Sequence, residues 1–180
     1  MTRLACAPST IAIHIGIIAD THGILRPEAC TALSGCDRIL HAGDIGNASV
    51  LAGLERIAPV LAVRGNVDSG PWAESLPDRA TAEFSGIRIL LIHNVHGLFG
   101  DPRTTDYQVV VSGHTHRPSL STHNGILHVN PGSAGPRRFQ LPVSLALLTI
   151  ANGEQVASLH DLTIGRSTSE FRVEQHRPPS

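Results

Sequence analysis

Short apolar runs separated by polar, glycine-containing segments organise most of this chain. The run at residues 11–19 (IAIHIGIIA) is almost continuously apolar and rich in isoleucine, which is typical of a strand covered on both faces. Segment 27–33, with Pro27 in its first turn, and segment 48–57 are predicted to be helices. Further apolar runs predict strands at residues 38–41, 59–63, 81–84, 87–92, 107–111, 126–129, 143–150 and 155–159.

The order of these elements predicts an α/β fold. In the first half, strands alternate with helices, which is typical of parallel strands joined by helical crossovers. The second half is mostly strand with tight turns such as Asn152-Gly153, which favours antiparallel pairing. Two mixed β-sheets flanked by helices would accommodate both halves. We find no repeat or linker, so we expect one domain over residues 11–165, with a ragged leader at 1–10 and a frayed polar tail at 166–180.

The composition narrows the possible functions. The chain has 180 residues, is 41% hydrophobic and has a mean hydropathy of +0.05, which fits one domain with a substantial core. A net charge of -1 and an aromatic content of 3% argue against a strongly basic or base-stacking nucleic-acid surface. All 14 basic residues are arginine, which excludes lysine catalysis. The 3 cysteines form no C-x-x-C pair and no run of about 20 apolar residues exists, so we expect a cytoplasmic protein without a membrane span.

Side chains that can bind metals follow five of the predicted strands. In open α/β sheets, ligands bind beyond the carboxyl ends of the strands, so we expect these side chains to meet in one crevice. Carboxylates, imidazoles and an amide without thiolates suit divalent ions such as Mn, Fe, Zn, Co or Ni. Seven ligands drawn from these clusters suit two ions about 3.5–4 Å apart better than one tetrahedral ion. The clusters are Asp20 and His22, His41 and Asp44, Asn66 and Asp68, His93 and His96, and His114 and His116.

A set of short motifs resembles those of the calcineurin-like metallophosphoesterases, and is most similar to the small single-domain bacterial and archaeal phosphodiesterases. The resemblance covers roughly residues 13–150. It implies a four-layer αββα sandwich of two mixed β-sheets flanked by helices, with a dinuclear metal site at the edge of the sheets. The motifs are Asp20-Thr-His22-Gly, His41-Ala-Gly-Asp44, Arg64-Gly-Asn66-Val-Asp68, His93, Gly113-His114-Thr-His116 and Asn130-Pro-Gly-Ser133.

The resemblance also implies a role for each matching residue. Catalysis would involve Asp44, Asn66 and His41, and a hydroxide bridging the metals would attack phosphorus in line. The ions would lower the pKa of that water, so no side-chain base is needed. We expect two divalent ions, Mn first, with Fe, Zn, Ni, Co or Mg as alternatives. One ion would be held by Asp20, His22 and His116, the other by Asn66, His93 and His114, and Asp44 would bridge them.

Two positions depart from the family pattern. Val67 stands where many members carry a histidine that is thought to protonate the leaving group. This favours substrates with better leaving groups, or another acid such as His41 or a water. His93 lies directly at the end of a predicted strand, so we assign it as the ligand, with His96 as the alternative.

Other polar residues have two interpretations each. We expect His41 to donate to a ligand carboxylate rather than to bind metal. Asp68 either supports a ligand or forms a structural turn. Arg137 and Arg138 follow a Gly/Pro loop, where they either contact a substrate phosphate or are solvated.

The leading hypothesis is a metal-dependent phosphodiesterase or phosphatase that acts on small phosphate esters. One alternative is a non-catalytic protein scaffold of the same fold, as in the retromer subunit, although a complete set of ligands argues against it. A nuclease is a second alternative, disfavoured by the near-neutral charge. We expect a small phosphoester as partner, no membrane and no sequence-specific nucleic acid. The natural substrate and the oligomeric state, including a homo-oligomer, stay open.

Overall fold

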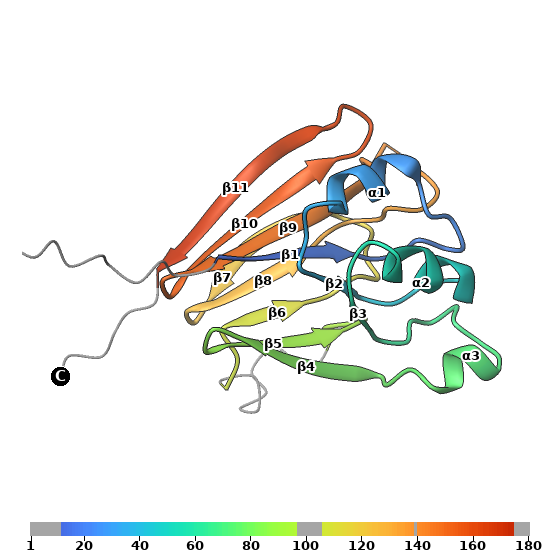
Figure 1. Ribbon diagram of the computed structural model, residues 1–180, viewed down its shortest axis with the longest axis horizontal. Coiled ribbons are helices and arrows are strands. Elements are labelled where there is room, and N and C mark those ends of the chain that lie inside the picture. Colours follow the sequence, from blue (N-terminus) through green and yellow to red (C-terminus); the bar gives the residue numbers. More distant parts are fainter. Residues whose placement is uncertain (1–11, 97–105, 139, 175–180) are drawn as a thin grey trace, which may run out of the picture.

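The computed structural model describes residues 12–96, 106–138 and 140–174, which form two β-sheets with short helices (Figure 1). The leader expected at residues 1–10 lies outside these ranges. The first sheet has the strand order β11 (Arg166–Glu174), β10 (Glu154–Asp161), β9 (Ser144–Ala151), β1 (Ile13–Ile18), β2 (Arg38–His41) and β3 (Val60–Ala62). The second has the order β4 (Arg79–Phe84), β5 (Ile87–Ile92), β6 (Val109–Val111), β8 (Ile126–Asn130) and β7 (Ser119–His123). The helices are α1 (Pro27–Leu33), α2 (Ala48–Glu55) and α3 (Pro71–Glu74).

Both sheets are mixed, as predicted. In the first sheet, β1, β2 and β3 run parallel, whereas β9, β10 and β11 run antiparallel to their neighbours. In the second sheet, β5, β6 and β8 are parallel and the edge strands β4 and β7 are antiparallel. The prediction that the second half pairs antiparallel is therefore wrong for β5, β6 and β8. Long connections join these three strands, and local sequence patterns do not reveal which strands such connections bring together.

Most buried apolar residues of the described chain belong to two layers. One lies between the sheets, where Ile15 and Ile17 of β1 pack with residues such as Leu91 of β5. The other lies between the first sheet and its helices, where Leu33 of α1 and Leu54 of α2 are fully buried. Strand β1 is thus covered on both faces, as its sequence predicted. The crossover from β5 to β6, from which a fourth layer would come, includes residues 97–105, outside the described ranges.

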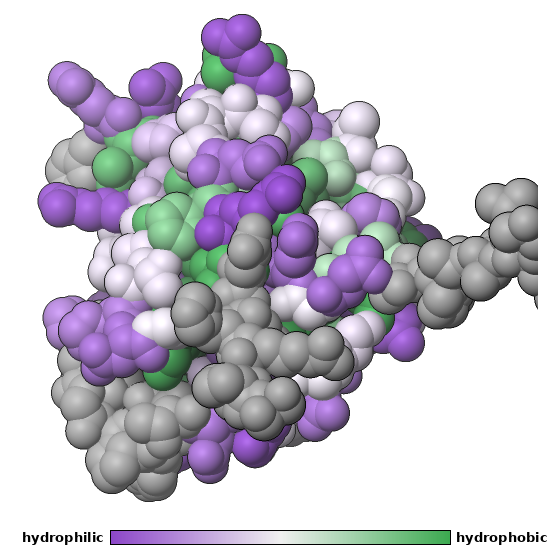
Figure 2. Space-filling model, turned by 90° about the vertical axis from the view of Figure 1, so that its left-hand side faces the viewer, coloured by the Kyte–Doolittle hydropathy of each residue, from purple (hydrophilic) through white to green (hydrophobic). Residues whose placement is uncertain are grey.

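The carboxyl ends of the parallel strands lie together at one end of the molecule (Figure 1). Figure 2 shows the opposite end, where hydrophilic side chains surround smaller apolar areas. A groove there is lined by the beginnings of β2 and β3, and another by the beginning of β1. In the described part of the chain, none of the helices has the length and apolarity needed to cross a membrane.

The C-terminal segment corrects one expectation. Residues 166–174 do not fray but form β11, which pairs antiparallel with β10 along its length. Phe171 and Val173 alternate with polar residues and pack against the core between the sheets. Two apolar side chains at spacing two are a weak signal in a polar segment, and only the partner strand makes them sufficient.

The packing of β11 can be tested with a neighbouring pair of substitutions. Phe171→Ala should lower the free energy of unfolding by about 1–3 kcal/mol, because it removes half-buried apolar surface from the core. Arg172→Ala is the matched control, since its side chain is 57% exposed and its ion pair with Glu154 lies at the surface. Denaturant unfolding measures both, and equal values for the two variants would contradict the packing of β11.

Candidate metal centre

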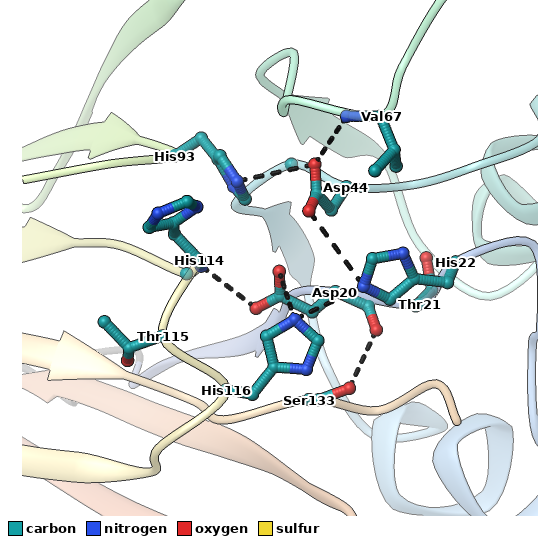
Figure 3. A network of polar contacts seen from close by, with 12 residues as sticks. Asp20, Thr21, His22, Asp44, Val67, His93, His114, Thr115, His116 and Ser133 are labelled. Carbon is teal, nitrogen blue, oxygen red and sulfur yellow. Dashed lines mark hydrogen bonds and ion pairs between the residues drawn. The ribbon is translucent and has the colours of Figure 1, made fainter. Parts of the chain in front are cut away.

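Loops that follow four strands meet at one end of the two sheets (Figure 3). Backbone hydrogen bonds align these loops, with the Asp20 amide donating to the Gly43 carbonyl at 3.0 Å and the Gly113 amide to the His93 carbonyl at 3.0 Å. The structure therefore brings together six of the seven predicted ligands. These are Asp20 and His22 after β1, Asp44 after β2, His93 after β5, and His114 and His116 after β6.

Unusual backbone conformations aim most of these side chains. Five of the six residues have a positive φ, which costs free energy in any residue other than glycine. The other described non-glycine residues of this kind, Ser85, Asn124 and Asn152, each precede a glycine in a hairpin turn. No hairpin explains the conformation at the site, so the strain is concentrated where side chains converge. The φ values are 53° for Asp20, 47° for His22, 53° for Asp44, 68° for His114 and 58° for His116.

One group of four side chains surrounds a point that fits a single cation. Asp20, His22, Asp44 and His116 each offer a ligand atom, and these atoms all lie within 4.8 Å of one another. The Nε2 atoms of His22 and His116 are 3.3 Å apart, and His116 Nε2 lies 3.5 Å from Asp20 Oδ1. Two nitrogens bound to one tetrahedral ion at about 2.0–2.1 Å are themselves about 3.3 Å apart. The spacing therefore matches the coordination shell of a divalent metal.

A second group forms around the other oxygen of Asp44. His93 Nδ1 donates to the Ala42 carbonyl at 2.7 Å, which turns Nε2 toward Asp44. His93 Nε2 lies 3.4 Å from Asp44 Oδ1 and has no hydrogen-bond partner. The ring of His114 stands edge-on to His93, with centroids 5.2 Å apart. Because Asp44 Oδ2 faces His22 at 4.0 Å, the carboxylate directs one oxygen toward each group.

Buried atoms without partners gather at this place. Among the described buried side-chain atoms, four have no hydrogen-bond partner, and three of them are Asp20 Oδ1, His93 Nε2 and His116 Nδ1. A buried polar atom without a partner is destabilising, so a cluster of them indicates a missing ligand. A cation between the two groups would satisfy Asp20 Oδ1 and His93 Nε2, and the residues present fit that ion.

Burial shifts the pKa values of Asp20, His22 and His116 in the first group. It raises the pKa of Asp20 to about 8, and the Asp44 carboxylate adds to the rise. Burial also lowers the pKa of His22, and it lowers the pKa of His116 to about 4. At neutral pH both imidazoles are therefore neutral and able to bind metal, whereas Asp20 must lose a proton when a cation binds.

His41 has a different role from the one expected. Its Nδ1 accepts from the Gly43 amide at 3.2 Å, so Nε2 carries the proton and donates to the Thr21 hydroxyl at 2.9 Å. The predicted hydrogen bond to a ligand carboxylate is thus wrong, because the Thr21 hydroxyl occupies the donor. Burial lowers the pKa of His41 to about 3, and the side chain is inaccessible. It positions the loops after β1 and β2 and cannot protonate a leaving group.

The loop at residues 64–68 reaches the site through its backbone. The Val67 amide donates to Asp44 Oδ1 at 3.0 Å, and a side chain at Gly65 would collide with the backbone nitrogen of Asp44. Asp68 accepts from the amides of Gly65 at 2.8 Å and Gly46 at 2.7 Å, which supports its interpretation as a structural turn residue. Asn66 is exposed on this loop, and its side chain makes none of the hydrogen bonds that link the described residues of the two groups. Its role as a ligand stays a prediction.

The choice between His93 and His96 is clear in the structure. His93 is buried at the cluster, whereas His96 is exposed and its amide donates to Asn94 Oδ1 at 2.9 Å.

Two supporting residues were missed in the sequence. The Ser133 hydroxyl donates to the Asp20 carbonyl at 2.9 Å, and Asn130 Nδ2 donates to the Gly113 carbonyl at 2.8 Å. Both belong to the Asn-Pro-Gly-Ser motif, so the motif was a signal of their importance although it did not reveal these contacts.

Comparisons with known proteins identify the family of this chain. A family model described as the calcineurin-like phosphoesterase superfamily domain matches residues 13–153. The chain belongs to the calcineurin-like phosphoesterase superfamily. A probable metallophosphoesterase from Methanothermobacter thermautotrophicus is 35% identical to this phosphoesterase-superfamily protein over 145 residues, covering 74% of this chain and 84% of the relative. Phosphodiesterase YfcE from Escherichia coli is 30% identical over 163 residues, covering 72% of this chain and 84% of YfcE.

Solved structures share the fold of this chain. Vacuolar protein sorting 29 from Cryptosporidium parvum superposes with a TM-score of 0.79 at 22% identity, covering 91% of this chain and 99% of that one. The E. coli phosphoesterase Yfce superposes with a TM-score of 0.68 at 25% identity, covering 90% of this chain and all of that one (100%).

The charge state of Asp20 gives a testable pH dependence. The folded, cation-free protein holds the Asp20 proton up to a pKa of about 8, against 3.8 ordinarily. The contribution of Asp20 to the free energy of unfolding of wild type therefore falls as pH rises from about 4 to about 8. Asp20→Asn removes the titration, so in EDTA the variant should gain roughly 2–5 kcal/mol on wild type between pH 5 and pH 8, measured by denaturant unfolding.

Adding Mn²⁺ at pH 8 should make wild type more stable than Asp20→Asn. The ion stabilises wild type, whereas the variant has lost one of its metal ligands. Identical pH profiles in EDTA would contradict the buried ionisation. Equal stabilisation of both proteins by Mn²⁺ would contradict the ligand role of Asp20.

Proposed function

We propose that this protein hydrolyses small phosphate esters, phosphodiesters above all, with two divalent cations held in the candidate metal centre. The observation that carries the proposal is the Asp44 carboxylate, whose Oδ2 faces His22 at 4.0 Å and whose Oδ1 faces His93 at 3.4 Å. Asp20, His22 and His116 would complete the first ion's ligands, and His93, His114 and Asn66 the second's. The mixed oxygen and nitrogen donors suit Mn²⁺, with Fe, Zn, Ni, Co or Mg as alternatives.

The chemistry needs little from other side chains. When bound, a pair of divalent cations supplies an activated water and neutralises charge on the phosphoryl group. The protein's residues hold their donor atoms fixed, because His93 is oriented by the Ala42 carbonyl and Asp44 by the Val67 amide. The hydrogen bond from the His114 amide to Asp20 Oδ2 at 3.1 Å likewise leaves Oδ1 free to bind. This rigid arrangement avoids reorganisation during the reaction.

The proton that the leaving group needs comes from solvent in this proposal. Val67 is 48% exposed next to Asp44, at the position where many members of the superfamily carry a histidine. His41 is fully buried and neutral, so it offers no replacement. Without a side-chain acid, esters with good leaving groups react well and unactivated alkyl monoesters react slowly. The name of the E. coli relative, phosphodiesterase YfcE, supports the emphasis on diesters.

A protein scaffold of the same fold is the alternative function. Its support is the structural similarity to vacuolar protein sorting 29, at a TM-score of 0.79. One such structure, from Entamoeba histolytica, is described as complexed with Zn²⁺, so metal binding alone does not separate the two functions. Turnover of a phosphoester separates the two functions.

The ligand assignment is tested by removing single side chains. Asp44→Ala, His93→Ala and His116→Ala should each lower turnover of bis-p-nitrophenyl phosphate with Mn²⁺ by roughly 100-fold or more, because each removes a metal ligand. His96→Ala is the matched control, since this histidine is exposed on the segment that follows β5, outside the cluster.

Bound metal is measured in the same samples by elemental analysis, with two ions per chain expected for wild type. Near-wild-type activity in Asp44→Ala or His116→Ala would refute the site. A wild-type protein that binds metal but turns over no phosphoester would favour the scaffold.

Val67 generates a separate prediction on substrates. Wild type should turn over p-nitrophenyl diesters faster than alkyl monoesters, whereas Val67→His should improve alkyl esters selectively by supplying a proton donor at the mouth of the site. The gain is expected to be on the order of 10-fold or more. Val67→Ala is the control for lost apolar surface, and equal wild-type rates on both ester classes would contradict the reasoning.

A further inference from the structure

Among the described residues, three large apolar side chains are exposed, and two of them lie on loops that build the metal centre. The exposed fractions are 42% for Ile24, 48% for Val67 and 53% for Ile164. Ile24 follows the ligand candidate His22 by two residues, whereas Ile164 lies in the turn between β10 and β11. A single exposed apolar side chain is common on protein surfaces, so Ile164 requires no explanation. The presence of two at one polar site does require an explanation.

Backbone hydrogen bonds fix Val67 directly beside the metal centre. Its amide donates to Asp44 Oδ1 at 3.0 Å, so its side chain begins close to that carboxylate (Figure 3). The next residue, Asp68, accepts from the amides of Gly65 at 2.8 Å and Gly46 at 2.7 Å, which holds the loop on the segment that follows β2. Because Val67 contacts the site through its backbone, its exposed side chain is available to another molecule.

A tight turn places Ile24 next to the same segment. The Ile24 amide donates to the Thr21 carbonyl at 2.9 Å and closes a turn whose central residues, His22 and Gly23, have φ values of 47° and 83°. The Gly23 amide donates to the Ile45 carbonyl at 2.7 Å, which ties the turn to the loop after β2. His22 and Ile24 therefore belong to one fixed turn.

Glycine forms the surface between the two apolar side chains. Gly46 lies against the turn of Ile24 on one side, where an added side chain would come within 2.5 Å of the Gly23 nitrogen. On the other side its amide donates to Asp68, which follows Val67. Neither Gly23 nor Gly46 has a side chain that could cover Ile24 or Val67. Both apolar side chains are therefore left open to a bound molecule.

The metal centre recognises only one part of a phosphate ester. Its donor atoms, and the cations that they would hold, act on the charged phosphoryl group, whereas the groups esterified to phosphorus extend beyond it. Apolar surface is stabilised when another apolar surface covers it and releases water. Ile24 and Val67 offer such surface on the loops that carry His22 and contact Asp44. An apolar ester group is the part of a substrate that would cover them.

We propose that Ile24 and Val67 form a specificity surface for an apolar ester group, so that the substrates are phosphate esters with an aryl or another apolar substituent. This inference rests on the proposed function, because it names the substrate class of the same site. The two side chains select the substituent and leave recognition of the phosphoryl group to the metal centre.

The test compares the binding of phenylphosphonate and methylphosphonate, which share a charged head group and have a P–C bond in place of an ester. Isothermal titration calorimetry on the full chain loaded with Mn²⁺ gives the ratio of their dissociation constants. Wild type should prefer phenylphosphonate. Val67→Ser and Ile24→Ser should each lower this preference by roughly 3- to 10-fold, the range expected when a half-exposed apolar side chain loses its contact.

Two further variants control for side effects. Ile164→Ser removes exposed apolar surface from the turn between β10 and β11 and should keep the wild-type preference. Val67→Ile keeps an apolar side chain and should keep the preference as well. Methylphosphonate affinity and Mn²⁺ content, the latter from elemental analysis, should stay unchanged in all four variants, because the Val67 amide that contacts Asp44 belongs to the backbone.

Three results would overturn the proposal. The first is an unchanged preference in Val67→Ser and Ile24→Ser. The second is an equal loss of preference in Ile164→Ser, which would show a general effect of surface polarity. The third is equal weakening of both phosphonates, or loss of Mn²⁺, in Val67→Ser and Ile24→Ser, which would show that these residues support the ligands instead of selecting the substituent.

Failure of the proposed function looks different from these outcomes. In that case wild type itself would bind neither phosphonate in the presence of Mn²⁺ and would hydrolyse no phosphoester. If wild type is active and the Ile24 and Val67 variants match it, the proposed function stands and only the apolar specificity is refuted.

Discussion

The site depends on polar atoms that are held close together away from water. Asp20 Oδ1 and His93 Nε2 are both buried without a hydrogen-bond partner, and His93 Nε2 lies 3.4 Å from an oxygen of Asp44. Buried polar atoms without partners are destabilising, and a bound cation would supply the partner that they lack. The apolar layer between the two sheets offsets the cost, and this is why such a cluster sits at the edge of a large core. Without its ions the metal centre is therefore locally destabilising, and the stability of the remaining fold offsets that cost.

Backbone geometry, more than side-chain packing, keeps these atoms in place. Five of the ligand-bearing residues have positive φ values, and hydrogen bonds from amides and to carbonyls fix the carboxylates and the His93 ring. Asp68 and His41 support the site indirectly, because each forms hydrogen bonds that join two of the loops. Removing a side chain from such a network changes the direction of its neighbours as well as the local charge.

Much of the site could be predicted from sequence because parallel strands place their carboxyl ends at one edge. Asp20, Asp44 and His116 each follow an apolar run, and that position alone predicted their convergence. The partner of His41 was not predictable, because the Thr21 hydroxyl reaches it only after two loops pack together. The parallel order of β5, β6 and β8 was missed for the same reason, since tertiary pairing decides it. Strand β11 was missed because its apolar signal consists of Phe171 and Val173 alone.

The origin of the ligands in both sheets has a mechanical consequence. Asp20, His22 and Asp44 extend from the first sheet, whereas His93, His114 and His116 extend from the second. A cation shared by these residues cross-links the two halves of the sandwich at the open edge of their interface. Separation of the sheets would then require release of the ion, so metal binding would stabilise the folded chain in addition to serving the proposed reaction.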